Sequence, residues 1–414
     1  MRNTILSLFF FIVFVYSVVP SPLFTISEQT SLFFAIFPAL FALLLAMSNH
    51  ISLLKRDFLY PIVILTIWAL VLYVNSGIRP SPYPFCAFLT AYVVYKIWRQ
   101  ALITKIVDYL IAFSIIGLII WLLNFIIGSL LSEIAIKINF PSYGNNIKAI
   151  LFWCINPDGI RNPGCCWEPG RYSCFLVIGI YLHSLKNGFH WKKDWRLWIL
   201  LLSLVTTMST TGFGAFIIFL TLRQFSFQKT INPLHLIGTL LLIEVAWSLP
   251  FMSEKIMEWW IDSDMLDTKI GQLEWLAANR PSDSYFVPQR FEGFAYRWID
   301  FLHMNFLTGD GHNFTKYYLN KNLGFMIAPS EGIIGVVLCY GIIIGFLIYL
   351  SLYKSSLYLS RLSTYSYKLP RMTFLILFIM MNFSYNFWEL PIIIPLWLMS
   401  FFESFKENKI TVQI

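Results

Sequence analysis

The stretch IVDYLIAFSIIGLIIWLLNFIIGSLL at residues 106–131 carries a single charged side chain, Asp108. A helix of about 20 apolar residues crosses the hydrocarbon core of a bilayer, so this stretch predicts a transmembrane helix. The same pattern recurs along the chain, and we expect about twelve such helices. The predicted segments are 4–19, 31–48, 58–75, 82–98, 106–131, 170–185, 195–209, 212–225, 234–250, 329–352, 371–387 and 390–404.

The composition of the whole chain agrees with that pattern. Of the 414 residues, 57% are hydrophobic and only 13% are charged, whereas soluble domains carry about 25% charged residues. This excludes a soluble enzyme, a disordered tail, a collagen-like rod and a small disulfide scaffold, and predicts an all-α polytopic membrane protein. The net charge of +8 is spread in short groups between apolar runs. We therefore expect contacts with membrane lipids and no nucleic-acid partner.

The distribution of basic residues predicts the orientation of the helices. If Arg2 is cytoplasmic and the helices alternate, 18 of the 30 Lys and Arg residues are cytoplasmic, and 11 of the other 12 lie in two long outer segments. Long loops escape the positive-inside rule, so both termini are expected in the cytoplasm. The expected divisions are N-terminal helices (1–131), a first outer loop (132–169), central helices (170–250), a large outer-loop subdomain (251–328), and C-terminal helices with a cytoplasmic tail (329–414).

The first outer loop ends in a turn before an apolar helix. Arg161 and Glu168 bracket this turn, and Pro169 and Gly170 open the helix. Proline suits the first turn of a helix, where its missing N–H costs nothing. The pair is either an exposed Arg–Glu pair at a helix start or part of a functional site at the membrane surface.

The second outer loop contains an arginine pair. A helix is expected from about Gln289 to Phe306, and it would place Arg290 and Arg297 on one face, about 10 Å apart. Two guanidinium groups so placed can clamp a phosphate or diphosphate. The alternative is a solvated helix face on which Arg297 pairs with Asp300 or a neighbouring glutamate.

Further polar residues follow the pair. Gly309 and Gly311 permit a tight turn around Asp310, and His312 is either a general base or an exposed loop histidine. Lys321 comes next on the same loop.

Other polar positions have simpler interpretations. The hydroxyls of Ser209 and Thr210 are expected to cap the helix at 212–225, a reading favoured over ligand contact. Glu244 is the one clear ionisable residue expected inside the membrane. The six cysteines lack the spacing of metal ligands, and a disulfide among the three in the first outer loop (Cys154, Cys165 and Cys166) stays open.

Four of these motifs, in this order, resemble the bacterial O-antigen polymerases of the Wzy type. The segment 161–170 resembles their outer-loop signature, and Ser209–Gly212 resembles their Ser-Thr-Thr-Gly segment. Arg297-Trp298 followed by Gly309-x-Gly311 is similar to the pattern of their large loop, and 330–335 (SEGIIG) resembles the helix start after it. The resemblance covers about residues 155–350.

The resemblance implies a GT-C-like helical fold and a glycosyltransferase of the bacterial inner membrane that works on the periplasmic face. Donor and acceptor would be undecaprenyl-diphosphate-linked oligosaccharides, with a flippase and a chain-length regulator as partners and no cofactor or metal. The expected diphosphate-binding residues are Arg161, Arg290 and Arg297, because arginines stabilise charge on the leaving group. The expected base is Glu168, then His312 or Asp310, with Gly170, Ser209, Thr210, Gly309, Gly311 and Lys321 in the substrate-binding loops.

Two alternatives remain. The O-antigen ligases share this topology, but they resemble the chain less well, because Lys321-Asn322 stands where their histidine and asparagine are expected. A lipid-linked oligosaccharide flippase or another transporter would predict short outer loops, several intramembrane charges and repeated halves.

Overall fold

Helices dominate the computed structural model, which describes residues 2–18, 28–139, 146–155, 160–190, 193–227, 285–286, 290–312, 317–324, 326–327, 332–363 and 369–404. The helices in this part of the chain are α1 (Arg2–Val18), α2 (Glu28–Ser48), α3 (Arg56–Ser76), α4 (Tyr83–Trp98), α5 (Ala101–Ile134), α6 (Pro169–Asn187), α7 (Trp195–Thr207), α8 (Thr210–Phe227), α12 (Arg290–His303), α13 (Tyr318–Leu323), α14 (Ile333–Arg361), α15 (Thr373–Asn382) and α16 (Ile394–Ser404).

Helices occupy eleven of the twelve predicted membrane segments, and the twelfth, at 234–250, lies outside the described residues. Three of them, α3, α5 and α14, are long and apolar enough to cross a bilayer. Several others are shorter apolar helices. The structure is therefore that of a helical membrane protein. The helix expected at 289–306 is present as α12.

The longest helices show the surface that lipid favours. On α3, Trp68 and Leu72 are buried, whereas Ile67, Leu70 and Val74 are more than half exposed. On α14, Leu338 and Leu352 are buried while Phe346 is 64% exposed. Exposure of so much apolar surface is unfavourable in water but favourable against the hydrocarbon tails of lipids. The buried sides of these helices supply the core, in which α14 packs on α16, and α6 packs on α5, α7 and α8.

Two small sheets correct the expectation of a purely helical chain. In the segment predicted as the first outer loop, β1 (Ile136–Asn139), β2 (Asn146–Ile150) and β3 (Trp153–Ile155) form an antiparallel sheet in that order. The parallel pair β4 (Tyr285–Phe286) and β5 (Met326–Ile327) joins distant parts of the second loop. The alternation of apolar and polar residues in Ile136-Lys-Ile-Asn favours a strand, but four residues are too few to stand out beside long apolar helices.

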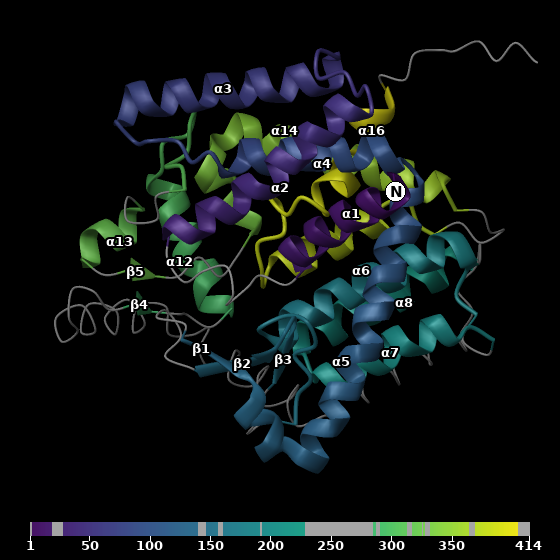
Figure 1. Cartoon of the computed structure of the whole chain (residues 1–414). Helices are drawn as coiled ribbons and strands as arrows, with labels where there is room; N and C mark the ends of the chain where they lie inside the picture. The colour runs from purple at the N-terminus through teal and green to yellow at the C-terminus, as the bar shows by residue number, and fades with distance from the viewer. Residues whose placement is uncertain are drawn as a thin grey trace, which may run out of the picture.

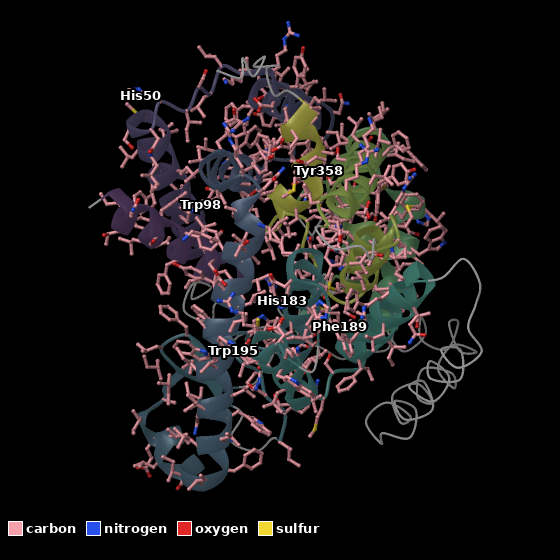
Figure 2. All side chains as sticks on the ribbon, turned by 90° about the vertical axis from the view of Figure 1, so that its right-hand side faces the viewer. His50, Trp98, His183, Phe189, Trp195 and Tyr358 are labelled. Atoms are coloured by element: carbon pink, nitrogen blue, oxygen red, sulfur yellow. The ribbon has the colours of Figure 1, made fainter. Side chains whose placement is uncertain are left out.

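The ends of the described helices lie in two groups. At one end, α4, α6 and α14 begin and α1 finishes; α12, α13, β4 and β5 gather on this side, at the left of Figure 1. The N-terminus lies at the right of that view. Figure 2 looks at the molecule from that right-hand side and labels residues at or next to the opposite helix ends, such as Trp98 and Tyr358. We call the two groups the α6 N-terminal end and the α6 C-terminal end.

Polar contacts tie the helices together at the α6 C-terminal end. Asp57 pairs with Lys96 and accepts a hydrogen bond from Tyr92 at 3.1 Å. Gln100 donates to the hydroxyl of Tyr358 at 3.0 Å. These residues belong to α3, α4, the link between α4 and α5, and α14, so this end joins parts of the chain that are far apart in sequence.

Candidate functional site

A break in α14 at a glycine provides the backbone groups that bind the loop after α12 (Arg290–His303). Gly341 has φ of +78°, which interrupts the helix. In an unbroken helix the amide of Ile342 would donate to the carbonyl of Leu338. Here Ile342 donates instead to the carbonyl of Phe306 at 2.8 Å, and the Leu338 carbonyl accepts from the amide of Asp310 at 2.7 Å. The break thus gives the loop after α12 a donor and an acceptor to bind.

Gly309 fits against this break because it has no side chain. Its φ is +65°, and a Cβ atom placed there would lie 2.3 Å from the carbonyl oxygen of Leu338. Gly311 also has a positive φ, +69°, and a Cβ there would lie 2.9 Å from a methyl group of Leu72. The two glycines expected in a tight turn therefore allow the loop that carries His312 to pack closely on α3 and α14.

His312 forms a buried pair with a carboxylate that the sequence analysis did not single out. Its Nε2 atom lies 2.6 Å from Oε1 of Glu389, which also accepts a hydrogen bond from the hydroxyl of Tyr340 at 2.5 Å. The rings of Trp68 and Tyr340 meet the imidazole edge-on, with centroids 6.2 and 5.4 Å away. The His312 and Glu389 side chains are only 18% and 16% exposed. His312 is thus a paired, largely buried histidine and not an exposed loop residue.

The chemistry of the pair follows from its surroundings. Burial lowers the pKa of His312, but the charge of Glu389 and its hydrogen bond outweigh burial and raise the pKa above the ordinary histidine value. The carboxylate next to Nε2 favours a proton on that atom, so in the neutral ring Nδ1 carries the lone pair. Nδ1 is buried and has no hydrogen-bond partner among the described residues. The pair therefore fixes the orientation of the ring and leaves Nδ1 as its acceptor atom, in a position closed to solvent.

Glu389 lies in the α15–α16 connection, which we define as residues 383–393. This connection brings several predicted motifs together. A Cβ at Gly170 would lie 2.1 Å from the hydroxyl oxygen of Tyr385, so the start of α6 packs on the connection. The hydroxyls of Thr211 and Ser384 are 2.8 Å apart.

The predicted cap before α8 is present, and the first turn of α8 packs on the neighbouring helix α6. The hydroxyl of Ser209 accepts a hydrogen bond from the amide of Gly212 at 3.3 Å, as expected for a helix cap. Gly212 in turn packs closely on Ser173 of α6. Thr210 begins α8 and is partly buried.

Arg161 lies beside the end of α7, just before the Ser209–Gly212 segment. Its Nε atom donates to the carbonyl of Thr207 at 3.1 Å. Asn162 next to it donates through its backbone and its side chain to Thr206, both at 2.9 Å. The motif around Arg161 and the Ser209–Gly212 segment are therefore neighbours in space, through the end of α7. Glu168 is the residue before α6 and does not cap that helix with its side chain.

Arg297 lies in a separate small core formed by α12, α13 and β5. Its Nη1 atom pairs with Asp300 at 2.6 Å, its Nη2 atom donates to the carbonyl of Ile327 at 2.8 Å, and its guanidinium lies over the ring of Tyr317. Both charged side chains are buried, with exposures of 1% and 0%. Asp300 also accepts from the amide of Leu319. The pairing with Asp300 was the alternative expected from the sequence, although it is buried and not solvated.

The remaining predicted positions are less informative. Arg290 begins α12, but its side chain lies outside the described residues, so the expected clamp with Arg297 is untested. Lys321 is exposed on α13. Asp310 is half-buried, and burial raises its pKa. Glu244 falls in the part of the chain that the structure does not describe.

The described residues contain no group of three or more His, Cys, Asp or Glu side chains that could hold a metal ion. The six cysteines all lie in the described ranges, and none of them forms a disulfide bond. The disulfide that the sequence left open in the first outer loop is therefore not formed in this structure.

Glu389 is the residue of this site that the sequence analysis missed. It is a lone carboxylate between the apolar runs at 371–387 and 390–404. That position was the available signal, because an ionisable residue flanked by membrane segments points to a functional site. Comparison of the chain with protein-family models, curated proteins and solved structures finds no match. The fold and the site together define a helical membrane protein with a buried His–Glu pair where several helix ends meet.

Proposed function

We propose that the protein is a polysaccharide polymerase of the O-antigen type. It would transfer an undecaprenyl-diphosphate-linked glycan to a hydroxyl group of another lipid-linked repeat unit. The observation that carries this proposal is the His312–Glu389 pair, because transfer to a hydroxyl needs a base. The pair also lies beside the motifs on which the resemblance rests. Gly309 and Gly311 position His312, and the connection that carries Glu389 packs on Gly170.

The proposed reaction is a displacement at the anomeric carbon of the donor sugar. Nδ1 of His312 takes the proton of the acceptor hydroxyl, and the acceptor oxygen bonds to that carbon. The bond between the carbon and the diphosphate oxygen breaks, and the electron pair leaves with the diphosphate. Glu389 is a positioning residue that stabilises the imidazolium formed in this step. Glu168, the first candidate base expected from the sequence, becomes the second candidate here, and it lies at the start of α6 close to the same connection.

The location follows from the proposed substrate. Lipid-linked repeat units would meet the enzyme on the periplasmic face of the inner membrane. The α6 N-terminal end would then face the periplasm and both termini the cytoplasm. A flippase would deliver the repeat units, and a chain-length regulator would act on the product.

The test is deletion of the gene in its own bacterium, followed by analysis of the surface glycan. A polymerase predicts single repeat units in place of long chains. A ligase predicts no glycan attached to lipid A core, and a flippase predicts lipid-linked repeats retained on the cytoplasmic face; either result would contradict the proposal. Complementation with His312→Ala should leave a residual rate roughly 10²–10⁴-fold lower. His303→Ala, which changes an exposed histidine on α12, should restore long chains.

A further inference from the structure

Arg171 in the first turn of α6 carries a charge that the described residues do not neutralise. Its Nε atom is buried and has no hydrogen-bond partner among them. Its Nη2 atom donates to the carbonyl of Ser17 at 3.4 Å, a distance near the limit for a hydrogen bond. Within the described ranges, no carboxylate oxygen lies within 4.0 Å of the guanidinium. Because arginine keeps its charge in proteins, this arrangement needs an anion from elsewhere.

Arg171 differs from Arg297 in the partner of its charge. Arg297 is already paired with Asp300, and Arg161 donates to the carbonyl of Thr207. Arg297 thus has a carboxylate partner in the described part of the chain and Arg171 has none, although the Nε atoms of both are buried without a hydrogen-bond partner there. Arg171 still has its Nε donor and most of its amino protons.

The surroundings of Arg171 suit a ligand with a charged head and an apolar body. Its guanidinium lies 5.9 Å from the ring centre of Phe175 and 5.7 Å from that of Phe387. The hydroxyls of Tyr83 and Tyr385 are close enough to interact with it electrostatically, and they can also donate hydrogen bonds to an anion. Glu168 acts on Arg171 through its field but forms no ion pair with it.

Arg171 also lies close to the proposed base. Phe387 and Glu389 belong to one short connection, in which Phe387 faces Arg171 and Glu389 binds His312. The hydroxyl of Tyr83 reaches the backbone carbonyl of Glu389 at 3.5 Å. An anion held by Arg171 would therefore lie beside the connection that carries Glu389, the partner of His312.

We propose that Arg171, in place of Arg297, binds the phosphate groups of an isoprenoid diphosphate. This assignment rests on the proposed function and specifies how its donor is held. The planar guanidinium offers two parallel donors to phosphate oxygens, which an ammonium cannot do. A free phosphate or a phospholipid headgroup offers the same oxygens, so the test must separate these sources.

The experiment uses the full-length protein in lipid nanodiscs and measures the dissociation constants of farnesyl diphosphate, inorganic pyrophosphate and farnesol. Arg171→Gln should weaken the binding of farnesyl diphosphate roughly ten- to a hundredfold, the range for a charge-assisted hydrogen bond. The dissociation constant of farnesyl diphosphate for Arg171→Lys should lie between those for the wild type and for Arg171→Gln. The matched control is Arg196→Gln, because Arg196 pairs with Asp108 on the surface, where the two side chains are 43% and 47% exposed.

Thermal unfolding separates ligand binding from a structural role. Removal of a partly buried charge that has no carboxylate partner relieves its desolvation penalty, so the ligand-free Arg171→Gln protein should unfold at the same temperature as the wild type or higher. Farnesyl diphosphate should raise the unfolding temperature of the wild type but not of the variant. A lower unfolding temperature of the variant, with unchanged affinity, would give Arg171 a structural role and overturn the assignment.

The other outcomes are equally clear. An unchanged dissociation constant for Arg171→Gln overturns the assignment and leaves the polymerase proposal standing. If pyrophosphate binds as tightly as farnesyl diphosphate, or if phosphatidylglycerol in the nanodisc abolishes the dependence on Arg171, the ligand is not an isoprenoid diphosphate. A wild-type protein that binds no phosphate ligand also overturns the assignment. The polymerase proposal is judged separately, by the glycan that remains after gene deletion.

Discussion

The carboxylate of Glu389 sets the protonation of His312, and this gives a prediction at the residue scale. In the proposed mechanism His312 must be neutral to take a proton, so the rate of polymerisation should rise with pH through the raised pKa of this residue. In Glu389→Gln the opposing charge is gone and burial remains, so the pKa of His312 should fall and the acid limb of the pH–rate profile should move to lower pH.

The measurement is the rate of glycan polymerisation against pH in membranes that contain lipid-linked repeat units. Tyr340→Phe is the matched variant, because it removes a hydrogen bond to Glu389 at 2.5 Å but keeps the carboxylate. Its acid limb should stay closer to that of the wild type. An acid limb that is the same in Glu389→Gln and in the wild type would show that another group is the base.

The ion pair of Arg297 and Asp300 gives a second prediction. Because both side chains are buried, Arg297→Met leaves Asp300 unpaired and should cost about 3–5 kcal/mol of unfolding free energy. Arg297→Met with Asp300→Asn should recover part of that loss, since asparagine can still accept from the Leu319 amide. The measurement is denaturant unfolding in detergent. If the single variant keeps its stability and loses only polymerisation, Arg297 binds the diphosphate as the sequence analysis proposed.

At the scale of elements, the break in α14 and the loop after α12 form one unit. Gly309→Ala would place a methyl group 2.3 Å from the Leu338 carbonyl, so the loop must shift and His312 with it. We expect a loss of polymerisation of at least tenfold. Gly324→Ala is the control: Gly324 has a similar φ, +72°, but nothing lies within 4 Å of its added Cβ. Both variants carry the penalty of a left-handed backbone, about 1–2 kcal/mol, and only Gly309→Ala carries the clash.

The comparison is made by glycan chain length and by the unfolding midpoint of the two variants. Equal chain lengths in both would mean that the close packing of Gly309 on α14 does not position His312.

Hydrophobic runs predicted the helices well because a span needs about 20 apolar residues whatever it packs against. α5 and α14, for example, overlap the predicted segments at 106–131 and 329–352. The break at Gly341 and the small sheet of β1, β2 and β3 could not be read in the same way. Both depend on partners that are far away or on runs too short to form a pattern.

The candidate site was predicted in part for a similar reason. His312 and Gly309 stood out because a polar loop with two glycines is unusual in an apolar chain. Glu389 is 77 positions from His312, and only the packing of the α15–α16 connection reveals that they meet. The buried partner of Arg297 could be guessed from its i,i+3 spacing to Asp300, but burial could not.

At the scale of the whole molecule, the contacts sort the helix ends into two groups, but they do not say which group faces the periplasm. The distribution of Lys and Arg predicts that the α6 C-terminal end is cytoplasmic. Labelling of single cysteines in intact cells with a membrane-impermeant maleimide tests this. Lys321 on α13 and Lys193 before α7 are both exposed. Lys321→Cys should be labelled in intact cells, whereas Lys193→Cys should be labelled only after the membrane is opened.

The native thiols provide the control for this experiment. Five of the six are buried, and Cys86 is partly buried, so the unmodified protein should take up little label. The prediction is strong because one orientation must satisfy both positions at once. Labelling of Lys193→Cys in intact cells, with Lys321→Cys protected, would mean that the orientation in the membrane is the reverse of the predicted one. It would place His312 and Arg171 on the cytoplasmic side, where a periplasmic polymerase could not use them.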